Sequence, residues 1–89
     1  MTIKKDITVA AVLAYKWYDA ILDGKKKTEY RDISDYWVKR LWAPAVRGRI
    51  GAITFQRGYT SVKATFEVLD ITVNRAEGLF EIHLGHRIG

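Results

Sequence analysis

Charged side chains are concentrated in one short stretch of the sequence, "GKKKTEYRD", which spans residues 24–32. A carboxylate placed between a lysine and an arginine stays ionised, and it can accept hydrogen bonds from a ligand or form an acid–base pair with the lysine. Side chains alternate along an extended chain, so Lys27, Glu29 and Arg31 are expected on one face of a strand. We interpret the stretch as a candidate site. The alternative is an exposed, ion-paired strand surface that contributes about 0–1 kcal/mol to folding.

The positive charge extends beyond this stretch. The net charge is +5, and residues 25–49 hold eight basic and three acidic residues, an excess of five that equals the whole net charge. A concentrated positive field attracts the phosphates of RNA, free nucleotides or anionic lipids. Aromatic residues such as Tyr36 can stack on bases between the cations. The alternatives are a solubilising face for the cations and core packing for the aromatics. The basic residues are Lys25, Lys26, Lys27, Arg31, Lys39, Arg40, Arg47 and Arg49.

Two further groups of residues have types suited to binding. Arg57 and Tyr59 flank Gly58 at the expected end of a strand, where they can offer a guanidinium and a stacking ring to a ligand; a plain hairpin turn is the alternative. His83 and His86 have an H-x-x-H spacing but do not share a strand face, so we predict no metal site. The chain has no phosphate-binding glycine motif, and we expect no cofactor.

Length and composition restrict the class of protein. A chain of 89 residues is expected to form one domain, residues 1–89. The absence of cysteine fits a reducing cytoplasm. No apolar run approaches the about 18–20 residues of a membrane span, and the N-terminal residues do not form a signal peptide. We therefore expect a cytoplasmic protein that does not bind membranes.

The first half of the sequence predicts two strands and two helices. Residues 7–13 form a β-rich apolar run, and a short helix follows in "YKWYDAILDG", with Tyr18, Ile21 and Leu22 on one face and Gly24 at its end. Residues 27–32 are expected to form a strand. Ser34 is an N-cap residue for the second helix, and Pro44 is expected to end that helix or to follow its end.

The second half predicts three strands. Residues 49–56 are almost continuously apolar, which is typical of a strand covered on both faces. In residues 61–73 the apolar positions change register at Val68–Leu69, so we predict a bulge or a marked bend there. Residues 79–85 return with alternate side chains inward. The order β-α-β-α-β-β-β predicts an α+β fold, a small and partly open β-barrel with two covering helices.

Four residues of the opening stretch carry a resemblance to a known family. Gly24, Lys26, Glu29 and Arg31 match the G-x-K-x-x-E-x-R signature of ASCH domains, which are PUA-like β-barrels. The preceding "YDAILDG" is similar to the first helix of that family. The segments "EYRDISDYWVKRL" and "FQRGY" resemble a small subgroup common in bacteriophage genomes, and the resemblance implies the host cytoplasm as the location if the protein is phage-encoded. The resemblance covers about residues 15–59 and, more weakly, "EIHLG" near the end.

The resemblance implies a cleft between barrel and helices, and an association with RNA binding or nucleoside chemistry. One bacterial branch hydrolyses N4-acetylcytidine with a lysine, a threonine and a glutamate, and another branch is described as ribonuclease. The lysine matches Lys26, but Glu29 stands where the threonine belongs. The catalytic glutamate lies in a segment that this chain replaces with "NRAEG". We therefore do not carry the amidohydrolase activity over.

We expect a domain that binds RNA or a nucleotide or nucleoside ligand in a basic cleft around the signature. In this interpretation Lys26 contacts a phosphate or a base edge, while Glu29 accepts hydrogen bonds and is oriented by Arg31. One alternative is a hydrolase of modified nucleosides or RNA that uses Lys26 and Glu29. Another is a phage protein that engages a host factor. The expected ligand-binding residues are Gly24, Lys26, Lys27, Glu29, Arg31, Tyr36, Lys39, Arg40, Arg57 and Tyr59.

Overall fold

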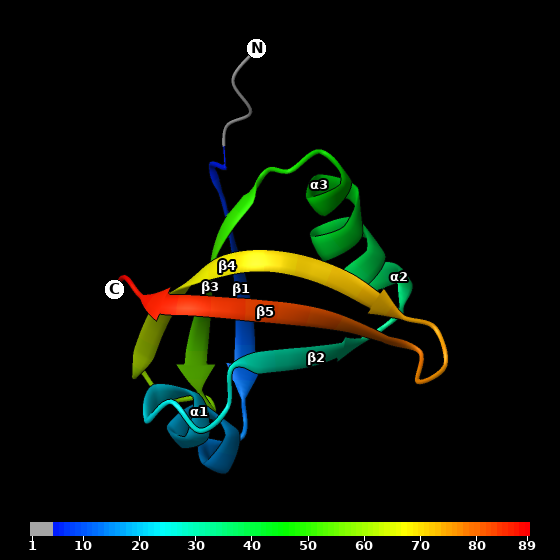
Figure 1. Cartoon of the computed structure of the whole chain (residues 1–89). Helices are drawn as coiled ribbons and strands as arrows, with labels where there is room; N and C mark the ends of the chain where they lie inside the picture. The colour runs from blue at the N-terminus through cyan, green and yellow to red at the C-terminus, as the bar shows by residue number, and fades with distance from the viewer. Residues whose placement is uncertain (1–4) are drawn as a thin grey trace.

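The chain folds as an α+β half-barrel in which five curled strands are accompanied by two helical segments (Figure 1). The computed structural model describes residues 5–89. The predicted order β-α-β-α-β-β-β is confirmed, with the second helix divided into three consecutive pieces. The elements are β1 (Ile7–Leu13), α1 (Tyr15–Leu22), β2 (Thr28–Asp32), α2 (Asp35–Trp37), η1 (Val38–Trp42), α3 (Ala43–Val46), β3 (Ile50–Arg57), β4 (Lys63–Asn74) and β5 (Leu79–Arg87).

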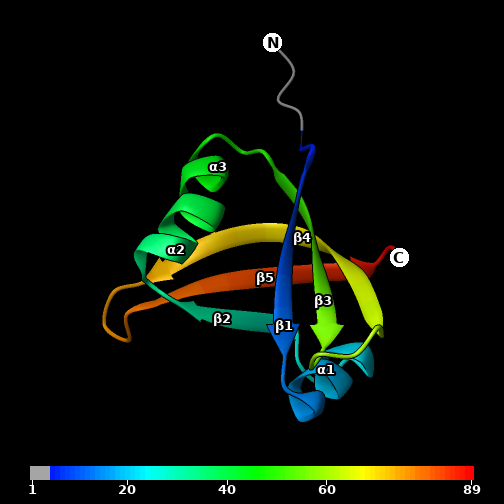
Figure 2. The ribbon, with the colours of Figure 1, turned by 180° about the vertical axis from the view of Figure 1, so that it is seen from behind.

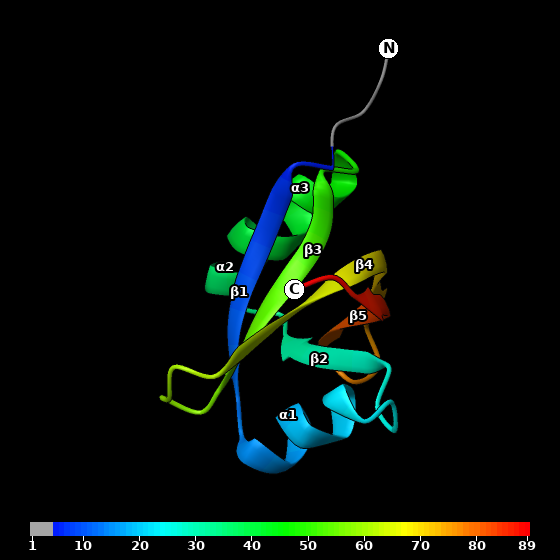
Figure 3. The same ribbon diagram turned by 90° about the vertical axis from the view of Figure 1, so that its left-hand side faces the viewer.

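The sheet has the order β1-β3-β4-β5-β2, so β1 and β2 are its two edge strands. Strands β1 and β3 are parallel, whereas the other neighbours are antiparallel. The sheet curls so strongly that its two edges approach each other on one side of the molecule (Figure 2). Helix α1 lies at one end of the half-barrel, and the segment α2–η1–α3 lies near the other (Figure 3).

Strand β4 allows the curl because it bends. Its first part, as far as Glu67, pairs with β3, and its later part pairs with β5. The β4–β5 register shifts on both sides of Val68. Val68 is buried while the adjacent Leu69 is 58% exposed. The predicted irregularity at Val68–Leu69 is thus confirmed, since a bulge bends a strand and increases its twist.

The core fills the concave side of the sheet. Phe80, Ile82 and Leu84 of β5 are buried as the alternating pattern predicts, and they pack with Phe55 of β3 and Leu41 of η1 in one cluster. Burial of these apolar side chains is the main stabilising contribution. Because Leu41 belongs to this cluster, the second helical segment is fixed to the barrel.

Helix α1 ends as predicted, but one of its apolar residues is placed differently. Gly24 has a φ of +82°, the left-handed conformation that commonly follows a helix. Tyr18 and Ile21 are buried, whereas Leu22 is 43% exposed, so its predicted place on the buried face is wrong. A helix of eight residues turns only one narrow face to the barrel, and Leu22 lies beside that face.

The second helix begins as predicted and ends later than predicted. The Ser34 hydroxyl accepts from the Trp37 amide, as an N-cap does. The helix then continues through Pro44 to Val46, so the expectation that Pro44 ends it is wrong. The reason is the π-helical turn η1, in which the Ala43 amide bonds five residues back to Val38. This wider turn accommodates a proline that has no N–H to donate.

Within residues 5–89 no helix has the length and apolar character needed to cross a lipid bilayer.

Candidate functional site

The signature carboxylate, Glu29, lies inside the protein and holds two cations. Its exposed fraction is 4%, and among residues 5–89 it is the only residue with a charged side chain that is buried. Its Oε1 accepts from Lys26 Nζ at 2.9 Å and from the Tyr30 amide at 2.9 Å. Its Oε2 accepts from Arg31 Nη2 at 3.0 Å. Two charge-assisted hydrogen bonds and one from a backbone amide thus replace the hydrogen bonds with water that the carboxylate loses on burial.

This burial argues against the alternative interpretation of the stretch as an exposed, ion-paired strand surface. The side chains of Lys26 and Arg31 are 18% and 19% exposed, so their contacts with Glu29 are shielded from solvent as well. Two tryptophans cover the cations: the Trp17 ring centre lies 4.6 Å from Lys26 Nζ, and the Trp37 ring centre lies 5.2 Å from the Arg31 guanidinium carbon. Removing one partner of such a shielded cluster is more destabilising than breaking a surface ion pair, because it leaves a buried charge uncompensated.

Arg31 links this cluster to the opposite edge of the sheet. Its Nη2 also donates to the main-chain carbonyl of Val12 in β1, at 3.0 Å. Its Nε is buried and has no hydrogen-bond partner among the described residues. The guanidinium therefore reaches from β2 across the gap between the two edge strands and ends at β1.

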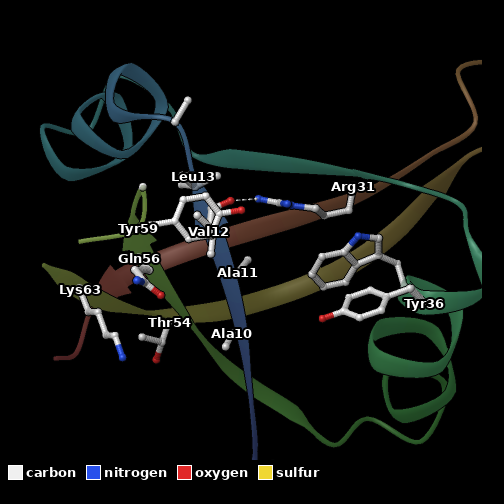
Figure 4. A pocket seen from close by; sticks show the side chains of 13 residues that line it. Ala10, Ala11, Val12, Leu13, Arg31, Tyr36, Thr54, Gln56, Tyr59 and Lys63 are labelled. Atoms are coloured by element: carbon white, nitrogen blue, oxygen red, sulfur yellow. Dashed lines mark hydrogen bonds between the residues drawn. The ribbon is translucent and has the colours of Figure 1, made fainter. Parts of the chain in front are cut away.

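A groove of about 650 Å³ runs along β1 beside this contact (Figure 4). Figure 4 shows Arg31 and Tyr36 on one side of β1, Gln56 and Lys63 on the other side, and the Tyr59 ring over β1 in this view. Tyr36 is 54% exposed and Tyr59 is 94% exposed, so both rings are open to a ligand. The remaining lining residues are Ala10, Ala11, Val12, Leu13, Ala14, Trp37, Thr54 and Gly58.

The groove brings together only part of the predicted site. Arg31, Tyr36 and Tyr59 line it, whereas Gly24, Lys26 and Lys27 line a separate hollow of about 480 Å³ between α1, the middle of β4 and the end of β5. Arg40 and Lys39 lie outside both, on η1. Arg40 nevertheless contacts the groove, because its guanidinium carbon is 4.3 Å from the centre of the Tyr36 ring.

Arg57 is held by contacts within the protein. It forms two hydrogen bonds with Asp19 of α1, at 3.0 and 3.1 Å, and its guanidinium lies 4.2 Å from the Tyr15 ring centre. The hydrogen bonds from Arg57 hold the pKa of Asp19 below its ordinary value. The neighbouring Gly58 has a φ of +56°, and a Cβ at that position would meet the Tyr15 ring. Arg57 and Gly58 thus anchor the β3–β4 turn to α1, and Tyr59 projects from this anchored turn.

The basic segment 25–49 divides into two clusters at opposite ends of the molecule. Lys25 to Lys27 lie on the α1–β2 connection, and the cations of residues 39–47 lie on the second helical segment (Figures 1 and 3). Arg49 pairs with Asp6 instead, at 3.1 Å. The sequence places all these charges close together along the chain, but β2 separates the two clusters in space.

Three groove residues with polar side chains were absent from the sequence prediction: Thr54, Gln56 and Lys63. Thr54 and Lys63 belong to no motif, so no sequence signal marks them, whereas Gln56 lies within the "FQRGY" segment, of which only Arg57 and Tyr59 were predicted to bind. The three polar residues meet only because β3 and β4 pair, with Thr54 opposite Thr65 and Gln56 opposite Lys63.

The two histidines have ordinary partners. His83 Nε2 lies 2.8 Å from the Thr72 hydroxyl, and His86 Nδ1 lies 3.3 Å from a carboxylate oxygen of Glu67. Within the described part of the chain, no three His, Cys, Asp or Glu side chains gather in a way that would hold a metal ion.

Comparisons with known proteins do not assign a family. No family model matches the chain, and no match was found among curated proteins.

Proposed function

We propose that this chain is an ASCH-type, PUA-like domain that binds single-stranded RNA or a nucleotide in the groove along β1. The signature Gly24, Lys26, Glu29 and Arg31 and the half-barrel architecture support the family assignment. The aromatic and cationic side chains of the groove support a nucleic-acid or nucleotide ligand.

The observation that carries the proposal is the meeting of aromatic rings and cations in one groove. Tyr36 and Tyr59 offer exposed rings, Arg31 and Lys63 offer positive charge, and Arg40 stands against the Tyr36 ring. Single-stranded nucleic acids are bound by this combination, because bases stack on the rings and phosphates approach the cations. Each stacked base contributes roughly 1–3 kcal/mol.

In this proposal the signature acts by positioning. Glu29 has three hydrogen bonds within the protein and is almost inaccessible, so it orients Arg31 and does not meet the ligand itself. Arg31 is the signature residue that lines the groove. The same contacts make acid–base catalysis by Lys26 and Glu29 the weaker alternative. Lys26 Nζ and Glu29 Oε1 form an ion pair with each other at 2.9 Å, so neither is turned toward a substrate.

The test compares tyrosine substitutions that differ only in their position. Fluorescence anisotropy with a labelled, short single-stranded RNA of mixed sequence measures the dissociation constant. Tyr36→Ala, in the groove, should weaken binding by about tenfold or more, because one stacked base is lost. Tyr30→Ala is the matched control: Tyr30 is similarly exposed, at 46%, but lies outside the groove.

Two results would contradict the proposal. The first is the absence of any RNA or nucleotide binding by the wild-type protein. The second is an equal effect of the two substitutions, which would place the ligand elsewhere on the surface.

A further inference from the structure

Strand β1 presents a free row of backbone groups to the groove. The Ile7 amide donates to Arg49 at 3.0 Å, and the Leu13 carbonyl accepts from Gly58 at 2.7 Å, so the odd-numbered residues of β1 turn their backbone groups toward β3. Backbone groups of successive residues in a strand point to opposite sides. Those of Ala10 and Val12 therefore point away from β3, on the side where no described strand pairs with β1.

The Val12 carbonyl is the last group of this row, and Arg31 occupies it. The Val12 carbonyl is already bonded to Arg31 Nη2, at 3.0 Å. The groups that remain for a ligand in the groove are, in order, the Ala10 N–H, the Ala10 carbonyl and the Val12 N–H. The row therefore offers a hydrogen-bond donor, then an acceptor, then a second donor. Ala10 is exposed and its methyl side chain is small, so the row is accessible from the groove.

We propose that this row recognises the imide edge of uracil, an inference that rests on the nucleotide-binding function proposed above. Uracil presents a carbonyl oxygen, an N–H and a second carbonyl oxygen, which is the complement of donor, acceptor and donor. Cytosine presents a donor and two acceptors, guanine an acceptor and two donors, and adenine one donor and one acceptor. Each of these leaves at least one backbone group without a partner, which weakens binding.

The surroundings of the row fit the rest of a uridine nucleotide. Figure 4 shows Tyr36 and Arg31 on the same side of β1. The exposed Tyr36 ring offers a stacking surface for the base. Arg40, 4.3 Å from the centre of that ring, offers a charge for the phosphate. Within the groove, three outward groups closed off by Arg31 match the length of a planar base edge, whereas an added peptide strand would also have to pair with Thr8, which lies outside the groove.

The first experiment uses ligands that differ only at the proposed contact. Isothermal titration of the wild-type protein compares uridine monophosphate, its 3-methyl derivative, cytidine monophosphate and adenosine monophosphate. Uridine monophosphate should bind about tenfold or more tightly than each of the others, because 3-methylation removes the central N–H and the other bases mismatch the row. In ¹⁵N-resolved NMR spectra, the amide signals of Ala10 and Val12 should shift with uridine monophosphate and not with its 3-methyl derivative.

The outcomes separate this inference from the proposed function. Equal affinity for all four nucleotides, or for RNAs of different base composition, would overturn uracil recognition and leave nucleotide binding intact. Failure of every nucleotide and every RNA to bind would overturn both. Tighter binding of another nucleotide would overturn the assignment of the row to uracil.

A matched pair of proline substitutions tests the row within the protein. Ala10→Pro removes the first donor without breaking a bond to β3, since proline is tolerated where an edge-strand N–H faces outward. Thr8→Pro removes an equivalent donor of β1 outside the groove. Only Ala10→Pro should reduce the preference for uridine over cytidine monophosphate. Equal preferences in both variants, with melting temperatures showing that both are folded, would overturn the proposal.

Discussion

Arg31 and Val12 join the two edge strands of the sheet. Arg31 Nη2 in β2 donates to the Val12 carbonyl in β1 at 3.0 Å, although β1 and β2 lie at opposite ends of the strand order. A closed barrel would join these edges by a ladder of backbone hydrogen bonds. Here a side chain held by Glu29 makes the connection, and no other strand among residues 5–89 pairs with the outer edge of β1.

Replacement of Arg31 by lysine should loosen this connection. Lysine keeps the charge beside Glu29 but lacks the longer, planar guanidinium whose Nη2 donates to both Glu29 and Val12. Loss of one hydrogen bond costs about 1 kcal/mol, or about 4–8 °C in melting temperature for a chain of this size. Amide exchange at the β1 edge should also become faster. Arg47→Lys, at an exposed position, is the control, and equal melting temperatures for the two variants would contradict the connection.

Glu29→Gln should destabilise the fold strongly. The substitution leaves Lys26 and Arg31, each under 20% exposed, without the carboxylate that compensates their charge. Removing one partner of a shielded ion cluster costs about 3 kcal/mol, which corresponds to more than about 10 °C in melting temperature. Glu77→Gln, at an exposed carboxylate, should change stability by less than about 0.5 kcal/mol. A small effect at Glu29 would show that the cluster is not structural.

Gly58→Ala should destabilise the protein more than Gly78→Ala does. Both glycines have positive φ, at +56° and +66°, so alanine is strained at either position. Only at position 58 does a Cβ meet another group, the ring of Tyr15, while nothing lies within 4 Å at position 78. The two denaturation midpoints measure the difference, which should be about 1–3 kcal/mol. Identical midpoints would show that the ring moves aside without cost.

The pair of Asp19 and Arg57 should make stability sensitive to acid. Hydrogen bonds from Arg57 lower the pKa of Asp19 in the folded state. The pair therefore stabilises the fold above the carboxyl pKa of the unfolded chain, and this contribution is lost as the pH falls through the lower, folded value. Asp19→Asn should melt below wild type at pH 7, and the difference should shrink below about pH 4. A difference that does not change with pH would contradict this assignment.

Charge reversal on η1 should weaken RNA binding. Lys39→Glu combined with Arg40→Glu removes exposed cations near Tyr36, so fewer phosphates are neutralised. The affinity for single-stranded RNA should fall, and the slope of log affinity against log salt should become shallower. The matched control, Lys25→Glu with Lys27→Glu, reverses two charges in the other cluster. A larger loss in the control than in the η1 variant would move the binding surface to the α1–β2 connection.

Much of the fold follows from local patterns in the sequence. The change of apolar register at Val68–Leu69 predicts the bend of β4, and Ser34 and Gly24 predict helix ends, because each signal acts within a few residues. Pro44 misled the prediction because the π-helical turn before it is a local distortion that the sequence does not indicate. Leu22 misled it because the width of the buried face of a helix depends on what packs against it.

The sequence by itself determined the order of the elements and the alternation that places Glu29 and Arg31 on one face of β2. It did not determine that this face is buried or that Arg31 reaches Val12. The groove, its free backbone row and the division of the basic segment were also decided by the tertiary structure. The physical reason is that strand periodicity is fixed by backbone geometry over neighbouring residues. Which edges meet depends instead on how the sheet curls, and thus on contacts between residues far apart in the chain.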